Sequence, residues 1–534
     1  MKKMFSAALA AGIALSAFAN GAVENPYRPP RKKLIDMSWS NPSVDYLVEN
    51  LARMEQESPV DGITVRFVGR KPGVEGKAGD VHCHNIITKD VWQYEWFAGQ
   101  IAKYKNLKFN RFTDNFIYTT MTPAKDMDWF DDAYWAAICN NYGILARITR
   151  ECGMTGIVFD PEEYGGQIWR RYPGHSHGEA IAKARQRGRE WGRAVFGANP
   201  DIKLLCLFLF SNGTYLNGDQ VNHTLSHSFF NGVYDVLPAT ATMIEGHEYF
   251  GYFANTDAEF EKLRTDLDRT FLPRVAAENY NKYRTQTQLA APIYPDEMVN
   301  PKHPCYNYLK PEVEQTPFPE YLRQNLQRAL NVSDEYVWVY SETGCWWSKS
   351  PHPKVKGSWD QQFPGTNRIF IELANPDFLA AGAQNLVEVP AAGMGKWMFW
   401  TAINHQGRGI WQNGVVSITG VKLRGSVHTS IPAIAGHEYM LSVEVRPKSP
   451  AITGSASLSA SFRAVNNAWM RAPGQEKVVQ MRSKQRGEWE TLTIRIVAPE
   501  NCKLLYFQMG VAGLKDNEAV EFRNPRLIDL TTAE

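Results

Sequence analysis

Two carboxylates separated by one residue follow a short apolar run, Gly156 to Phe159. Asp160 ends the run, and Pro161 separates it from Glu162. If the run is a buried β-strand, its period of two places both side chains on the same side of the chain. Charged side chains are rarely buried without a partner or a chemical role. The pair is therefore a candidate for acid–base catalysis.

The closeness of these carboxylates has an electrostatic consequence. Both cannot ionise freely, so one of them keeps its proton to a higher pH. A carboxylic acid that stays protonated near neutral pH can protonate the leaving oxygen of a glycosidic bond. We therefore expect Glu162 to be a general acid and Asp160 to tune its pKa. The alternative is a structural pair, either salt-bridged or placed at the N-terminus of the next helix.

A second candidate carboxylate is Glu342, which follows the apolar run Tyr336 to Tyr340 and precedes two tryptophans. A carboxylate beside indole rings suits a sugar subsite, because the acid can act at C1 while a ring stacks on the sugar. We expect Glu342 to be the nucleophile, or the base toward water, and Trp346 to contact the sugar. A local ion pair of Glu342 with Lys349 is the structural alternative.

Other residues near predicted strand ends are candidates for substrate contact. Glu245, His247 and Glu248 follow the run Ala239 to Ile244 and could supply the second carboxylate or bind sugar hydroxyls. The remaining candidates for substrate binding are Trp39, Asn115, Glu163, Tyr164 and Tyr294. Aromatic rings at strand ends can form the floor of a carbohydrate cleft, although core packing is the other explanation for each.

The elements that must position these residues alternate between apolar runs and helical patterns. The predicted strands are 34–37, 62–68, 109–117, 155–159, 204–210, 239–244, 289–294 and 336–340. This alternation indicates parallel βαβ units of the α/β class, and eight such units favour a (β/α)8 TIM barrel. In that fold the carboxyl ends of the strands carry the active site. An open doubly wound sheet is the alternative, but no glycine-rich phosphate loop supports it.

The spacing of hydrophobic residues changes from helical to strand-like after a last helical pattern at 368–382. Strand-like alternation at 439–445, 456–462, 489–497 and 504–509 predicts an antiparallel β-sandwich. We place the catalytic barrel at 20–383 and the sandwich at 384–534. The sandwich resembles carbohydrate-binding modules of the jelly-roll kind, which implies that it either binds sugar or braces the barrel.

The fourth predicted strand carries a family resemblance as well. Gly156-Ile157-Val158-Phe159-Asp160-Pro161-Glu162-Glu163-Tyr164 resembles the signature of chitinases and endo-N-acetylglucosaminidases. The resemblance implies that Glu162 is the acid and that Asp160 is its partner, orienting the acetamido group of the substrate. Glu342 would then be a binding residue. Val158 and Pro161 stand where that family usually has Asp and Trp.

The ends and the composition of the chain narrow the choice of function. Lys2 and Lys3, the apolar run 5–17 and the A-x-A sequence at 17–19 predict a bacterial signal peptide over residues 1–19. We therefore expect export to the periplasm or beyond, with no integral membrane segment. A net charge of +2 gives no case for nucleic-acid binding. The seven scattered cysteines do not form a disulfide framework, although one bridge is possible.

A metal-dependent hydrolase is one alternative, because His82-Cys83-His84 resembles the H-x-H pair of amidohydrolases. No zincin spacing or serine-hydrolase elbow is present, and we expect neither a metal nor another cofactor. The sequence thus predicts an exported glycoside hydrolase that acts on a poly- or oligosaccharide. A carbohydrate-binding barrel without catalysis is the second alternative.

Overall fold

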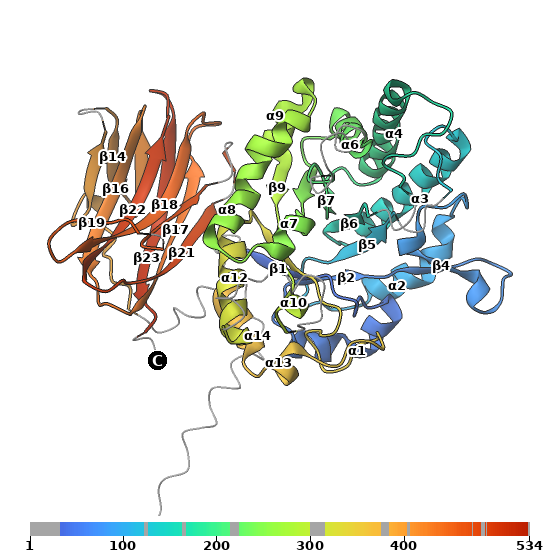
Figure 1. Cartoon of the computed structure of the whole chain (residues 1–534), viewed down its shortest axis with the longest axis horizontal. Coiled ribbons are helices and arrows are strands. Elements are labelled where there is room, and N and C mark those ends of the chain that lie inside the picture. Colours follow the sequence, from blue (N-terminus) through green and yellow to red (C-terminus); the bar gives the residue numbers. More distant parts are fainter. Residues whose placement is uncertain are drawn as a thin grey trace, which may run out of the picture.

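The computed structural model places a parallel barrel-like domain beside an antiparallel β-sandwich (Figure 1). It describes residues 32–121, 126–162, 167–213, 224–299, 316–374, 384–402, 406–472, 474–481, 486–487 and 489–531.

The first domain is built on a nearly closed sheet of nine parallel strands. In the order of pairing, the strands are β10 (Ala291–Ile293), β11 (Tyr336–Val339), β1 (Lys33–Asp36), β2 (Gly62–Val65), β5 (Phe116–Thr120), β6 (Gly156–Asp160), β7 (Lys203–Cys206), β8 (Thr242–Glu245) and β9 (Thr287–Leu289). The two strands at the ends of this order, β9 and β10, are separated in sequence by Ala290 alone.

Helices follow most of these strands. The α-helices are α1 (Val44–Glu57), α2 (Ala98–Lys105), α3 (Asp132–Glu151), α4 (His177–Ala198), α6 (Ser226–Asp235), α7 (Glu248–Phe253), α8 (Asp257–Asp266), α9 (Tyr280–Gln286), α10 (Pro295–Val299), α12 (Phe318–Val332), α13 (Trp359–Gln362) and α14 (Thr366–Ala374). The shorter helical turns are η1 (Gly76–Gly79), η2 (Cys83–Asn85), η3 (Tyr94–Phe97), η4 (Leu267–Phe271), η5 (Leu272–Arg274) and η6 (Ala277–Asn279).

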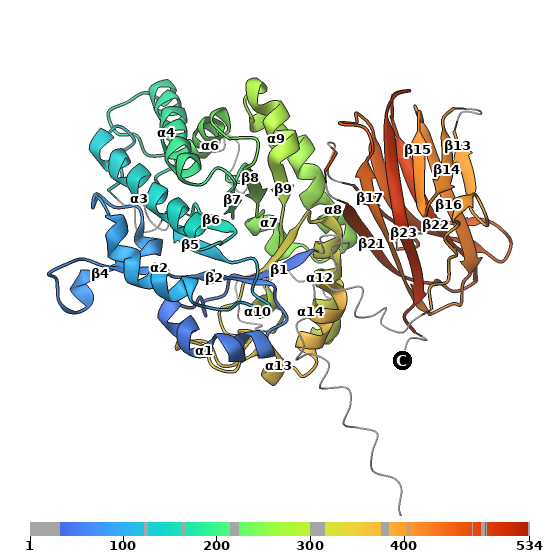
Figure 2. The ribbon, with the colours of Figure 1, turned by 180° about the vertical axis from the view of Figure 1, so that it is seen from behind.

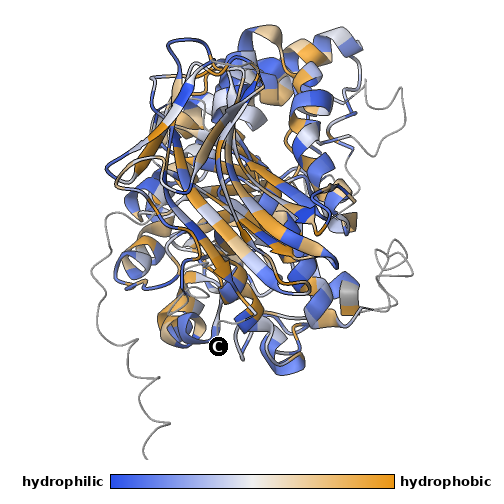
Figure 3. Ribbon diagram, turned by 90° about the vertical axis from the view of Figure 1, so that its left-hand side faces the viewer, coloured by the Kyte–Doolittle hydropathy of each residue, from blue (hydrophilic) through white to orange (hydrophobic). Residues whose placement is uncertain are grey.

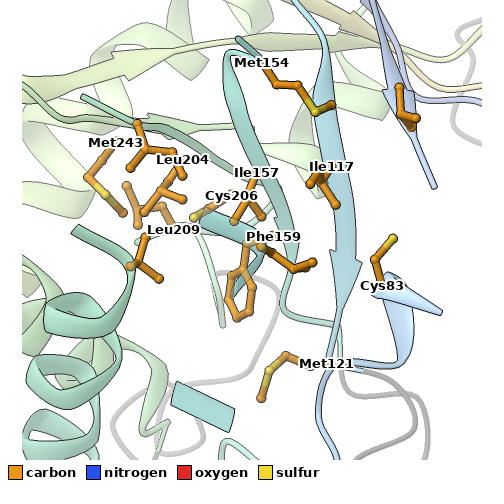
Figure 4. Packing of buried hydrophobic residues seen from close by; sticks show 14 of the residues in the cluster. Cys83, Ile117, Met121, Met154, Ile157, Phe159, Leu204, Cys206, Leu209 and Met243 are labelled. Carbon is orange, nitrogen blue, oxygen red and sulfur yellow. The ribbon is translucent and has the colours of Figure 1, made fainter. Parts of the chain in front are cut away.

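The alternation of side chains along each strand decides what points into the barrel. Along β6, Val158 belongs to the interior cluster of strand residues. Phe159 points the other way and packs on Tyr142 of α3 and Trp191 of α4, with ring centroids 6.0 and 5.9 Å apart. Figure 4 shows Phe159 and Ile157 in this outer layer. Asp160 shares the parity of Val158 and is therefore directed toward the barrel interior.

The predicted strands overlap the observed strands of the barrel, but β2 and β7 end earlier than predicted, and the third strand differs most. That strand spans Phe116–Thr120, whereas the pattern predicted 109–117. Asn115 consequently precedes the strand instead of lying near its carboxyl end. Helix α3 is capped by Asp131, whose side chain accepts the N–H of Tyr134. The nearly closed order of the sheet does not support the open doubly wound alternative.

The second domain confirms the predicted antiparallel β-sheet architecture. One sheet has the order β12 (Ala392–Gly393), β14 (Arg408–Gln412), β15 (Val415–Thr419), β23 (Ala519–Asp529), β17 (Glu438–Pro447) and β21 (Glu490–Val497). The other has the order β13 (Met398–Thr401), β16 (Arg424–Pro432), β22 (Cys502–Ala512), β18 (Ser455–Ala464) and β19 (Trp469–Met470), and β20 (Glu476–Gln480) pairs with β18.

In the first domain, a separate hairpin outside the barrel sheet joins β3 (Val68–Arg70) and β4 (Asp80–His82).

Alternating burial along these strands builds the core of the sandwich. Hydrophobic and hydrophilic segments alternate along them (Figure 3). Leu505, Phe507 and Met509 of β22 point inward and belong to a hydrophobic cluster separate from that of the barrel. Helices α8 and α12 face strand β21 across the boundary between the domains (Figure 2).

Two further expectations concern cysteines and membrane segments. The six cysteines of the described residues are free thiols, and Cys206 is buried. Cys305 lies outside the described residues. Among the helices that the structure describes, none combines the length and apolar character needed to span a bilayer.

Candidate active site

The carboxyl end of β6 holds Asp160 in a fixed orientation. Its side chain is buried, with an exposed fraction of 4%. The hydroxyl of Tyr118 on β5 donates to Oδ2 at 2.7 Å, and the backbone N–H of Glu162 donates to Oδ1 at 2.9 Å. Burial raises the pKa of Asp160, whereas these two bonds lower it. The same contacts hold Glu162, which is half-buried, directly beside Asp160.

Glu248 enters the same site from the loop after β8. The preceding residue, His247, has a φ of 49°, so the chain turns sharply before α7 begins. The Glu248 side chain is only 8% exposed. Its pKa lies well above the ordinary value, first because of burial and then because of the negative charges of Glu162 and Asp160. Three carboxyl groups from two strands therefore converge, and burial favours the proton on Glu248.

This carboxyl group has unused hydrogen-bonding capacity. The hydroxyl of Tyr252 lies beside Glu248. Neither that hydroxyl nor Oε2 of Glu248 forms a hydrogen bond within the described part of the chain. Buried polar atoms are normally satisfied, so two unsatisfied atoms side by side indicate a place where a ligand or water binds.

Tyrosine rings surround the carboxyl groups. The ring of Tyr252 lies 4.6 Å from that of Tyr294 and 5.8 Å from that of Tyr340, measured between centroids. The Tyr294 and Tyr340 rings are 5.0 Å apart. Burial raises the pKa of all three hydroxyl groups, which therefore remain protonated at neutral pH. The site thus has aromatic walls that carry hydrogen-bond donors.

Glu342 lies on the other side of these tyrosines. The Tyr340 hydroxyl lies 3.2 Å from Oε1 of Glu342 and donates a hydrogen bond to it. The indole Nε1 of Trp39 donates to the same hydroxyl at 2.7 Å. Asp296 fixes the local backbone by accepting the N–H groups of Glu342 and Thr343 at 2.9 and 3.0 Å. The structure therefore brings Trp39, Tyr294 and Glu342 together, as the sequence predicted for strand-end residues.

Glu245 does not point into the site. It shares the outward parity of Met243 on β8 and is fully buried. Its two oxygens accept the backbone N–H groups of Leu209, Phe210 and Ser211 at 2.9–3.2 Å. They also accept the Ser211 hydroxyl at 2.7 Å and the N–H of His247 at 3.0 Å. Glu245 thus holds the loop after β7 and has no free oxygen for a sugar.

Two other expected binding residues are structural as well. His247 is fully buried, and its Nε2 lies 3.3 Å from Oδ2 of Asp266. Asn115 is buried at the amino end of β5 and accepts the N–H of Ile63 at 3.2 Å. Its own amide donates to the carbonyl of Phe112 at 2.7 Å. These side chains have no surface to offer a substrate.

Trp346 does not contact the site, contrary to the expectation that it binds the sugar. Its side chain is fully buried, and its ring packs 4.4 Å from Phe370 of α14. It belongs to the large core cluster and not to the tyrosine-lined interior. Trp39, which is half-buried, is instead the tryptophan beside Glu342. Glu163 and Tyr164 lie outside the described residues.

The histidine pair lies on and just after β4, near β5. The rings of His82 and His84 are 5.3 Å apart. Over the described ranges, no group of three or more His, Cys, Asp or Glu side chains is arranged to hold a metal ion. The structure therefore gives no support to the metal-dependent alternative.

Sequence reasoning missed Tyr252 and Tyr340. Tyr340 shares the inward parity of Tyr336 and Trp338, so the alternation along β11 could have identified it. Tyr252 lies four residues after Glu248 on α7, and this spacing places two side chains on one helix face. Its position became clear only from the folded barrel, in which Tyr252 joins residues of β11 in the interior cluster.

Comparisons with known proteins place the chain in no family. No family model and no curated protein matches it. Among solved structures, the enzymatically active domain of tailspike protein 4 of bacteriophage CBA120 aligns over 37% of this chain and 26% of its own, with 8% identity and a TM-score of 0.23. The chain thus spans about a quarter of that protein. TmCBM61, solved with β-1,4-galactotriose, aligns over 28% of this chain and 99% of its own, with 14% identity and a TM-score of 0.20. Similarity at this level carries no argument about the activity of the chain.

Proposed function

We propose that the chain is an exported glycoside hydrolase that cleaves a poly- or oligosaccharide by carboxyl general acid catalysis. The observation that carries this proposal is the buried carboxyl group of Glu248, whose pKa is raised beside Glu162 and Asp160. Most glycoside hydrolases use a pair of catalytic carboxyl groups, one protonated and one ionised. The tyrosine-lined walls and Trp39 supply the apolar and donor surfaces that a sugar ring needs.

The roles follow from burial. Of the two glutamates, Glu248 is the more buried, so it keeps the proton and donates it to the leaving glycosidic oxygen. Glu162 is half-buried, and in this proposal it acts either as the nucleophile at C1 or as the base toward water. The sequence pattern assigned the general-acid role to Glu162, whereas this proposal assigns that role to Glu248. Asp160 carries no proton to the substrate and instead positions Glu162 through its backbone N–H.

Glu342 is the alternative second carboxylate. The hydroxyl of Tyr340 holds it, and the charge of Glu248 acts on the same tyrosine, so the two glutamates flank one ring. In a substrate-assisted reaction of the chitinase kind, the acetamido oxygen would attack C1 and Asp160 would orient that group. The bond from Tyr118 to Asp160 supports such an orienting role.

We also propose that the first domain is a barrel of eight βα units. We count β9 and β10 as two halves of a seventh strand interrupted at Ala290, which completes eight βα units. We assign the barrel to 20–383, the sandwich to 384–534 and the export signal to 1–19. The sandwich either binds the same polysaccharide or braces the barrel through α8 and α12.

The test is hydrolysis of a panel of polysaccharides and aryl glycosides by the parent protein and by Glu162→Gln and Glu248→Gln. Each substitution keeps the shape of the side chain and removes one carboxyl group. Glu388→Gln, an exposed glutamate of the sandwich, is the matched control. We expect at least one substrate to be cleaved by the parent and the control, and its turnover to fall about 10²–10⁴-fold in both variants. Binding without cleavage by the parent would instead favour a carbohydrate-binding barrel.

A further inference from the structure

A group of basic side chains lies on the arc of the barrel formed by the loops after β11, β1 and β2. Arg66 directly follows β2, and its Nε donates to the carbonyl of Asn41 at 2.9 Å. Its backbone is held at both ends, since its N–H donates to Pro42 and its carbonyl accepts from Val44. The half-buried guanidinium group is therefore fixed in place.

The loop after β11 adds two basic residues on the same arc. The Nζ of Lys354 lies 4.6 Å from the centroid of the Trp39 ring. The His352 ring meets the same indole edge-on at 5.3 Å. Burial first, and then the positive charges of Lys354 and Arg66, lower the pKa of His352, so both cations lie within electrostatic reach of its ring. Burial, the neighbouring His82 and then Arg66 lower the pKa of His84, so the turn η2 after β4 also lies within electrostatic reach of Arg66.

Arg66 and Lys354 have no acidic partner in the described part of the chain. Among the ion pairs of the described residues, none involves Arg66 or Lys354. Like charges placed together repel one another, and a half-buried cation without a counter-charge is costly. Basic residues kept together in this way are typical of a site that receives an anion.

Trp39 connects this basic arc with the carboxyl groups. Lys354 and His352 contact its ring, and its Nε1 binds the Tyr340 hydroxyl, which in turn donates to Glu342. One half of the carboxyl edge of the barrel, at β6 and β8, thus carries carboxyl groups, and the other half, at β11, β1 and β2, carries these basic groups together with Glu342. A ligand that spans both halves needs a cleavable bond at one end and a negative charge at the other.

We propose that the substrate is an anionic saccharide, whose carboxylate or sulfate group binds at Arg66, Lys354 and His352 while the scissile linkage lies at Glu162 and Glu248. This inference rests on the proposed glycosidase function and names its substrate class. The sugar ring that bears the negative group lies against Trp39. A negative group placed at the half formed by β6 and β8 would be repelled by Asp160 and Glu162, so charge fixes the direction in which the saccharide binds.

The test compares matched substrates that differ in charge. Neutral, uronate-containing and sulfated forms of several polysaccharide backbones are offered to the parent protein, to Lys354→Met, and to Lys356→Met as the control. Lys356 is an exposed lysine of the same loop. We expect the parent to prefer an anionic form and to lose that preference between 50 and 500 mM salt, roughly as screening predicts. In Lys354→Met, the anionic-to-neutral ratio of kcat/KM should fall about fivefold through KM, as expected for one partly exposed charge pair.

Two outcomes would overturn the inference when hydrolysis is observed: a neutral best substrate, or an unchanged ratio in Lys354→Met. Whether uronate or sulfated forms are preferred identifies the anionic group. If no saccharide is cleaved, the proposed function fails. Affinity electrophoresis with the same neutral, uronate-containing and sulfated polysaccharides then tests separately whether the basic residues bind an anionic group. Retention of anionic over neutral glycans, reduced in Lys354→Met but not in Lys356→Met, would support the site. Equal retention, or no retention of any glycan, would overturn it.

Discussion

The hydroxyl of Tyr118 on β5 donates a 2.7 Å hydrogen bond to Oδ2 of Asp160 on β6. The bond crosses between neighbouring parallel strands at their carboxyl ends, where both side chains have the inward parity. It stabilises the ionised form of Asp160 against the effect of burial. Because Asp160 also accepts the N–H of Glu162, one tyrosine influences the position and the charge of the whole pair.

Tyr118→Phe should shift the pH dependence of catalysis. Loss of the hydrogen bond raises the pKa of Asp160, so this group stays protonated to a higher pH. The acidic limb of the kcat/KM profile should therefore move upward by about one pH unit. Tyr283→Phe is the control, because that buried hydroxyl donates to the carbonyl of Leu267. An unchanged acidic limb would show that Asp160 does not govern activity.

Glu248→Gln should raise stability at alkaline pH while it lowers activity. The pKa of Glu248 is raised above its ordinary value of 4.5, so the native state holds a proton that the unfolded state releases. The free energy of unfolding of the parent therefore falls as pH rises above that ordinary value. The variant lacks this loss, so thermal unfolding should show a higher Tm than the parent at pH 8 and an equal Tm at pH 4. A lower Tm of the variant at pH 8 would argue against a buried, proton-holding carboxyl group.

Glu245→Ala should destabilise the barrel. The substitution leaves three backbone N–H groups of 209–211 without their acceptor. We expect a loss of about 3 kcal/mol or more in the free energy of unfolding, measured by urea denaturation. Glu476→Ala, on an exposed position of β20, should change it by less than about 0.5 kcal/mol. A stable Glu245→Ala variant with weakened substrate binding would restore Glu245 as a binding residue.

The two tryptophans should separate stability from binding. Trp346→Ala removes a fully buried ring and should cost about 3–5 kcal/mol of unfolding free energy. Trp39→Ala removes a half-buried ring beside Tyr340, and its main effect should be a higher KM. Calorimetry and initial-rate kinetics on both variants check this contrast. The opposite pattern would return Trp346 to the sugar-binding surface.

Hydrophobic patterning predicted the barrel and the pair at the end of β6 because both depend on local signals. An apolar run followed by Asp160 and Glu162 marks a strand end whatever surrounds it. Parity extends this logic: Val158 and Asp160 point inward, whereas Met243 and Glu245 point outward. Parity along β8 could thus have excluded Glu245 from the site.

Long-range relationships could not be read in the same way. Glu248 lies beyond the strand, after the left-handed His247, so no period predicts its direction. Its proximity to Glu162 depends on β6 and β8 closing around the same interior. The burial of Trp346 depends on Phe370 of α14, which packs on it from a separate helix. Asn115 was predicted near the carboxyl end of the third strand because the predicted segment 109–117 lies before most of β5, which spans Phe116–Thr120.

The most direct test of the central claim compares Glu248→Gln and Glu162→Gln on two glycosides of the same sugar. One glycoside has a dinitrophenyl leaving group, which departs without a proton, and the other has a sugar leaving group, which needs one. The account predicts that Glu248→Gln loses about 10³-fold in kcat/KM on the sugar leaving group and less than about tenfold on the dinitrophenyl glycoside, whereas Glu162→Gln loses both. If Glu162→Gln shows the selective loss, then Glu162 is the acid, and if Glu248→Gln cleaves both like the parent, the proposed proton donor is wrong.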